Sequence, residues 1–169
     1  MRFDLDEIAD AVVYGDLPSL RNYFVNGLDP DIRNENDRWN LLHIALEPPA
    51  RMSNLAVLRL LIDNGVDVNA KDCDDWTPLH FAARKNDLES IRLLLESGAD
   101  PNCQSKDDYV PLQHSLSARP INLAVVDLLL ESGADPDLGR VGSARKYMQK
   151  VVREGRDEVL ALMQRYKPC

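Results

Sequence analysis

The sequence has 169 residues, with 20 Lys and Arg against 28 Asp and Glu, which gives a formal net charge of −8. Its apolar fraction of 44% and charged fraction of 28% are typical of folded globular chains and exclude a disordered acidic tail. The excess of acid also argues against nucleic acid as a partner, because binding to phosphates needs a field of Lys and Arg.

The first residues contain no basic segment followed by an apolar run, and no stretch of about 18 apolar residues follows, so we expect neither export nor a membrane span. The three cysteines, Cys73, Cys103 and Cys169, are odd in number and show no CxxC spacing. This argues against a secreted disulfide framework and against a zinc knuckle. We expect a cytoplasmic protein with free thiols.

Charge is divided unevenly along the chain. Residues 1–139 hold 12 basic and 25 acidic side chains, a net charge of −13, and residues 140–169 hold 8 basic and 3 acidic, a net charge of +5. The sequence therefore predicts an acidic body with a basic end. That end either forms a second contact surface or is a soluble cap that relieves repulsion within the acidic body.

The chain repeats itself at a period typical of stacked units. The nine residues 93–101 return unchanged at 128–136, and related segments precede them at 60–69 and 23–31. The glycines of these segments, at positions 27, 65, 98 and 133, are 38, 33 and 35 residues apart. A period of this size indicates a repeat architecture.

A second repeated segment marks the start of a helix in each unit. It occurs at 40–43, 77–80 and 110–113, and faintly at 143–146. Thr77 followed by Pro78 is a typical helix start, and Gly98 follows an apolar run as a typical helix stop. In the third unit the pattern predicts helices over 77–85 and 88–96, followed by a projecting loop over 100–109. Each helix is too short to be stable alone, so neighbouring units must stack.

These two segments at their mutual offset resemble the ankyrin repeat family over nearly the whole chain. The resemblance implies an all-α solenoid of stacked helix-turn-helix units with projecting β-turn loops, forming a single domain over 1–169. Its units would span about 4–36, 37–72, 73–105, 106–139 and 140–169, with the first and last as caps.

The resemblance also assigns a structural role to two of the histidines. His43 and His80 would each hydrogen-bond to the helix start and to loop backbone, in a motif that includes Thr77 and Pro78. His114 lies one place off that position, which Gln113 occupies. Since no phosphate loop, nucleophile elbow or metal-ligand spacing accompanies them, we expect no enzyme, no metal and no cofactor.

An aromatic residue precedes three of the predicted helix starts: Trp39, Trp76 and Tyr109. The resemblance places this position on the concave face, where partners commonly bind. Either these rings pack on the next loop, or they form a binding row for a basic protein through cation–π contact and charge complementarity. The other candidate residues are Asp37, Asp74, Asp75, Asp107, Asp108, Arg84 and Lys85.

The sequence therefore predicts a non-enzymatic protein-protein interaction module, acting as a monomer or within a heterocomplex. One hypothesis is an immunity protein or stoichiometric inhibitor that neutralises a toxin, because small acidic single-domain binders suit that part. The alternative is a regulatory adaptor or a subunit that resembles the ankyrin kinase inhibitors.

Overall fold

The computed structural model describes residues 3–47, 53–117, 120–139, 143–146 and 156–166. Within these residues the secondary structure is helical and contains no strand, so the all-α expectation is confirmed. The helices are α1 (Leu5–Tyr14), α2 (Leu17–Val25), α3 (Leu41–Leu46), α4 (Leu55–Asp63), α5 (Pro78–Lys85), α6 (Leu88–Glu96), α7 (Pro111–Ser115), α8 (Leu123–Glu131) and α10 (Arg156–Arg165).

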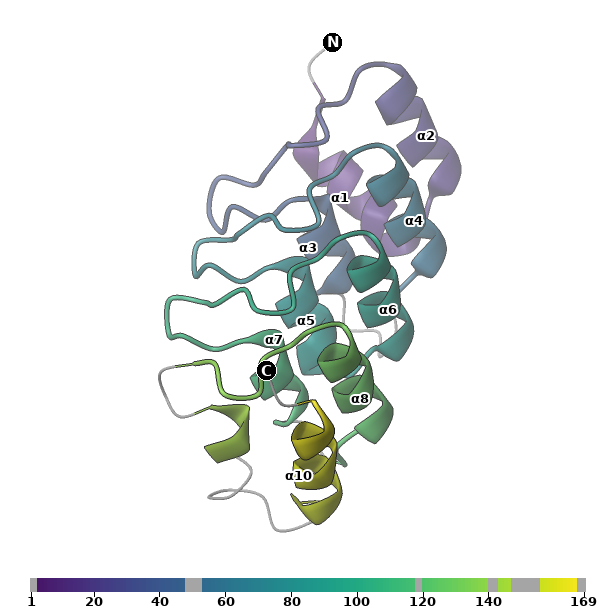
Figure 1. The fold of residues 1–169 in the computed structure, drawn as a ribbon. Coiled ribbons are helices and arrows are strands. Elements are labelled where there is room, and N and C mark those ends of the chain that lie inside the picture. The colour runs from purple at the N-terminus through teal and green to yellow at the C-terminus, as the bar shows by residue number, and fades with distance from the viewer. Residues whose placement is uncertain (1–2, 48–52, 118–119, 140–142, 147–155, 167–169) are drawn as a thin grey trace.

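The helices form two parallel rows with loops projecting from one side (Figure 1). Along the inner row α1 contacts α3, α3 contacts α5 and α5 contacts α7. Along the outer row α2 contacts α4, α4 contacts α6, α6 contacts α8, and α8 contacts α10. Each helix pair thus rests on its neighbours, as in a solenoid. The division into five units remains a prediction.

The third unit shows why the helices begin and end where they do. Pro78 occupies the first turn of α5, where its missing N–H would have no partner in any case. The helix ends at Asn86, whose φ of 52° is left-handed, and Asp87 then caps α6 by accepting from the Ser90 N–H at 3.3 Å. Gly98 follows α6 with φ 90°, a conformation that a residue without a Cβ adopts readily.

The core repeats along the stack because the same positions of successive units carry leucine. The inner row contributes Leu42, Leu79 and Leu112, and the outer row contributes Leu61, Leu94 and Leu129, all with 0% of their surface exposed. Burial of each such side chain stabilises the stack by roughly 2 kcal/mol. Stability is therefore a sum of interfaces between neighbouring units.

Asparagine side chains join the units on the side of the helix stops. Asn69 donates from Nδ2 to the Gly98 carbonyl at 2.9 Å and accepts from the Asp100 N–H at 2.8 Å. Asn102 makes the same two bonds one unit later, to Gly133 at 2.9 Å and from Asp135 at 2.7 Å. Asn69 and Asn102 hold the same place after the helix stop of successive units, so this repeated position encodes a repeated bridge.

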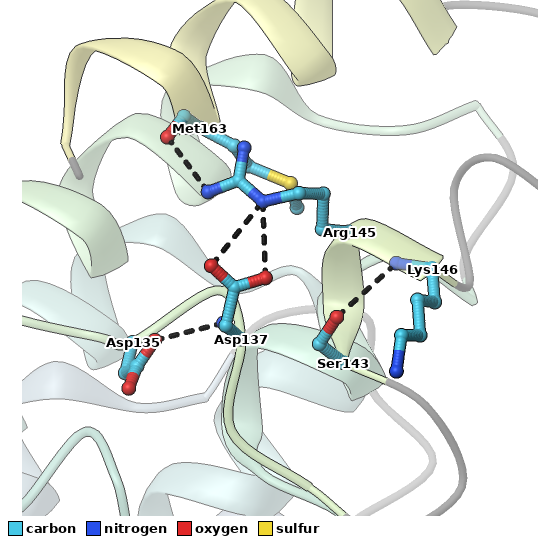
Figure 2. A network of polar contacts seen from close by, with 6 residues as sticks. All are labelled: Asp135, Asp137, Ser143, Arg145, Lys146 and Met163. Carbon is cyan, nitrogen blue, oxygen red and sulfur yellow. Dashed lines mark hydrogen bonds and ion pairs between the residues drawn. The ribbon is translucent and has the colours of Figure 1, made fainter. Parts of the chain in front are cut away.

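The bridge changes at the end of the stack, where Asp137 takes the equivalent position (Figure 2). Its carboxylate accepts from Nε of Arg145 at 3.0 Å, and Nη2 of Arg145 donates to the Met163 carbonyl at 3.2 Å. Because that carbonyl lies in the last turn of α10, it has no hydrogen-bond donor within the helix, and the guanidinium supplies one. Arg145 therefore ties α10 to the acidic body.

Candidate functional site

The projecting loops share one hydrogen-bonded form that fixes their aromatic residues. Asp72 shows it: its N–H donates to the Trp76 carbonyl at 2.9 Å, and its Oδ1 accepts from the Trp76 N–H at 2.8 Å. Ser105 makes the equivalent pair of bonds with Tyr109, at 2.9 Å and 3.1 Å. Each aromatic side chain therefore leaves its loop at the same place in the unit.

The turns of these loops are left-handed although none carries glycine. The φ angles are 60° at Arg38, 61° at Asp75 and 60° at Asp108. Asp adopts this conformation more readily than most residues, whereas for Arg it is strained. The loop tips then link through backbone bonds, from Cys73 N–H to the Asp37 carbonyl at 2.8 Å and from Lys106 N–H to the Asp74 carbonyl at 2.9 Å.

The predicted aromatic residues form a row joined by rings from the inner helices. Phe81 of α5 packs edge-on against Trp39 and Trp76, with ring centroids 5.5 Å and 5.6 Å away. His114 of α7 lies 4.2 Å from Trp76 and 5.6 Å from Tyr109. Trp39, Trp76 and Tyr109 are all half-buried, so each both packs on the stack and presents surface.

Sequence reasoning missed the inner half of this row. Phe81 and His114 are 33 residues apart, the same step that relates Trp76 to Tyr109. Applied to the helix position after the histidine motif, the period would have revealed them. These two rings join the row through tertiary packing, because the helix side chains close the gaps between successive loops.

His80 joins adjacent units beneath this row. Its Nδ1 accepts from the Thr77 N–H at 3.0 Å, so the proton lies on Nε2, which donates to the Tyr109 carbonyl at 3.1 Å. Burial, with a smaller contribution from His114, lowers the pKa of His80 to about 3. The ring is therefore neutral at physiological pH, and its nitrogens are committed to structural bonds.

The neighbouring units repeat this bond pattern with different side chains. His43 accepts from the Asn40 N–H at 3.2 Å and donates to the Trp76 carbonyl at 3.1 Å, and burial lowers its pKa. Gln113 accepts from the Val110 N–H at 3.0 Å through Oε1. A titratable ring is thus not required for this contact.

His114 is a packing residue of the row. Its Nε2 is buried without a hydrogen-bond partner, and burial lowers its pKa to about 4, with Arg84 acting in the same direction. A base needs a proton to abstract within reach, and the rings around His114 supply none.

A shallow cleft of about 180 Å³ opens where the second and third loops meet the inner helices. We call it the tryptophan cleft. Asp72 organises its floor, because its Oδ2 accepts from the Trp39 indole N–H at 3.3 Å while its Oδ1 also accepts from the Asp74 N–H at 2.8 Å. The cleft is lined by Trp39, Glu47, Asp72, Asp74, Trp76, Phe81 and Arg84.

The two predicted cations of α5 lie in different surroundings. The Arg84 guanidinium lies over the rings of Trp76 and Phe81, 5.2 Å and 5.3 Å from their centroids, and pairs with Glu47 at 2.6 Å. The Lys85 ammonium donates to the Leu46 carbonyl at the end of α3 at 3.0 Å, and burial lowers its pKa. Arg84 therefore belongs to the cleft, and Lys85 supports the neighbouring helix.

The predicted aspartates differ in exposure. Asp74 and Asp107 are exposed, whereas Asp37, Asp75 and Asp108 are half-buried. The exposed pair lies on successive loops.

The described residues offer no metal site, since no three of their His, Cys, Asp or Glu side chains group suitably. Cys73 and Cys103 are free thiols, and burial, reinforced by nearby aspartates, raises the pKa of both. A raised pKa leaves them mostly protonated and weakly nucleophilic. Cys169 lies outside the described residues, as do residues 140–142 and 147–155 of the basic end.

Comparison with known proteins identifies the repeats. The family model described as ankyrin repeats (3 copies) matches residues 8–105 and 50–140, which together cover more than half of the sequence. The chain belongs to the ankyrin repeat family. Ankyrin repeats are protein-protein interaction modules, so this ankyrin chain is one too. No helix among its described residues is long and apolar enough to cross a membrane.

The similar curated proteins match only part of the ankyrin chain. Protein phosphatase 1 regulatory subunit 12A of Mus musculus and of Rattus norvegicus is 42% identical over 67 residues, which are 40% of this chain and 6% of each relative. An ankyrin repeat protein of Fowlpox virus (strain NVSL) is 31% identical over 76 residues, 45% of this chain and 10% of the viral protein. The chain thus spans a small part of the relatives' length.

Proposed function

We propose that this ankyrin chain binds a basic protein through its loop face, without catalysing a reaction. The loop face consists of Trp39, Trp76 and Tyr109 with the exposed carboxylates of Asp74 and Asp107. The observation that carries the proposal is the alternation along this face of half-buried aromatic rings and exposed acid. Rings of this kind are enriched among binding hot spots, and their faces attract Arg and Lys.

The charge of the chain supports the same partner class. Residues 1–139 carry a net charge of −13, which would accelerate the approach of a basic surface and repel an acidic one. Half-burial of the rings adds preorganisation, because packing on Phe81 and His114 already limits their rotamers. Less ordering entropy is then lost on binding.

We consider two biological roles for such a binder, which would act in the cytoplasm as a monomer or within a heterocomplex. As a stoichiometric inhibitor or immunity protein it would cover the basic site of an enzyme or toxin. As a regulatory adaptor it would direct an enzyme instead. The mouse and rat relatives are named as regulatory subunits of a phosphatase, which favours the adaptor.

Charge reversal of the loop face tests the proposal without disturbing the core. Asp74→Lys with Asp107→Lys changes two exposed side chains and should abolish capture of the partner from the native host. Asp63→Lys with Glu96→Lys makes the same change of charge at exposed ends of the outer helices α4 and α6, and should retain capture. Equal capture by both double variants would refute the proposed face.

An activity assay of the captured protein then distinguishes the inhibitor role from the adaptor role. If it is an enzyme, an inhibitor would suppress its activity at a one-to-one ratio. An adaptor would leave its basal activity in place and alter its targeting or its choice of substrate.

A further inference from the structure

The tryptophan cleft has the chemistry of a site for a single cation. Three carboxylates line it, those of Glu47, Asp72 and Asp74, against the one guanidinium of Arg84, so its formal charge is −3 + 1 = −2. Aromatic rings form the remaining walls. A cation entering this cleft would meet aromatic rings and also carboxylates whose charge Arg84 does not neutralise.

We propose that the tryptophan cleft binds one arginine side chain of the basic partner, and that Arg84 occupies its place while the partner is absent. This inference rests on the proposed function and names the group that the loop face recognises. The remaining observations concern how Arg84 is held and how easily it leaves.

Arg84 demonstrates that a guanidinium fits the cleft. Its central carbon lies 5.2 Å and 5.3 Å from the ring centroids of Trp76 and Phe81, within the range of cation–π attraction. Its Nη2 meets the Glu47 carboxylate at 2.6 Å. The protein thus already supplies two rings and a carboxylate to a planar cation, the combination that favours arginine over the more strongly hydrated lysine ammonium.

The contacts of Arg84 leave it easy to displace. Its side chain is 44% exposed and that of Glu47 is 41% exposed, and ion pairs at such exposure contribute little to stability. The long side chain can turn outward into water from its position in the last turn of α5. Departure would free the rings and Glu47 together for an incoming guanidinium.

The other charged groups of the cleft divide between structure and binding. The Asp72 carboxylate accepts from the Trp39 indole and from two backbone N–H groups, so its part is to hold the cleft in shape. Asp74 is exposed beside it. The carboxylates that line the cleft and are left to meet an incoming guanidinium are therefore those of Glu47 and Asp74.

Intrinsic fluorescence reports directly on this cleft, because both tryptophans of the chain line it. The probe is the peptide acetyl-Gly-Arg-Gly-amide, titrated into the full chain. Removing an internal competitor raises apparent affinity, so Arg84→Ala should bind the peptide about threefold or more tightly than the wild type. Arg84→Gln should act in the same direction.

The control is Arg92→Ala, which makes the same change of net charge at an exposed position on the outer helix α6. Its affinity for the peptide should equal that of the wild type. Asp74→Asn should weaken binding, and the peptide with Lys in place of Arg should bind more weakly than the Arg peptide.

Unchanged or weaker binding by both Arg84 variants would overturn the proposal, because Arg84 would then be no competitor. An equal response to the Lys peptide would overturn the choice of guanidinium. The titration uses no partner protein, so its failure leaves the capture result for the loop face unaffected. Conversely, if the capture experiment refutes the loop face as the partner's binding surface, the peptide titration still tests whether the cleft binds a guanidinium.

Discussion

Acid should weaken this protein through His80, and the structure gives the size of the effect. The folded ring has a pKa of about 3, whereas the ordinary pKa of histidine is 6.5. Between these values the unfolded chain binds a proton that the folded chain refuses, so stability present above pH 6.5 is lost as the pH falls. At pH 5 the difference of about 1.5 units costs roughly 2 kcal/mol.

Protonation opposes folding for a reason visible in the contacts. The Nδ1 lone pair accepts from the Thr77 N–H and from the Thr77 hydroxyl at 2.9 Å. A proton on Nδ1 would face the backbone N–H, a donor that has no alternative orientation. The Tyr109 carbonyl already uses the Nε2 proton, so the ring cannot relieve the conflict by changing tautomer.

The assay is urea denaturation followed by circular dichroism at pH 7 and at pH 5. Wild type should lose about 2 kcal/mol more stability over this interval than His80→Gln, which cannot titrate. Glutamine suits the replacement because Gln113 makes the equivalent bond to Val110 N–H in the next unit. An equal loss in both proteins would refute the assignment of His80 as the buried neutral ring.

The remaining predictions concern the joints between units. Asn102→Ala removes two hydrogen bonds to the next unit, so chemical denaturation should show a loss of about 1–2 kcal/mol. Arg145→Met should accelerate hydrogen exchange in α10 by about tenfold, with the exposed Lys146→Met as the unaffected control, because the Met163 carbonyl loses its donor. Arg38→Gly should raise the thermal midpoint by a few degrees, roughly 1 kcal/mol, since it relieves a left-handed φ of 60°.

The repeated segments predicted the fold well, because start and stop signals act locally. The expected helix over 88–96 is the observed α6, and the expected 77–85 differs from α5 by one residue at the cap. Glycine, proline and capping residues decide these boundaries through their own backbone preferences. Such signals act within one unit and do not depend on contacts with the neighbouring unit.

The candidate site was harder to predict because contacts across units compose it. The sequence suggested Trp39 and Trp76 but not the Phe81 ring between them, nor that Glu47 holds Arg84 from 37 residues away. Lys85 stays a predicted contact residue, but the sequence did not suggest that its ammonium donates to the carbonyl of Leu46 at the end of another helix. The direction that a long side chain takes depends on its neighbours in the stack, which the local pattern does not specify.

In the proposed loop face the rings that would recognise the partner also pack on the stack, and this determines which variants can distinguish recognition from folding. Truncating Trp39 or Trp76 to Ala removes their packing on Phe81, and because both rings are half-buried the loss should be a part of the roughly 3–5 kcal/mol that a fully buried ring contributes. A loss of binding in such a variant would therefore report on the stack as much as on the partner. Exposed charges such as Asp74 and Arg84 can be changed while the rings stay packed. Recognition should accordingly be measured through the charges and stability through the rings.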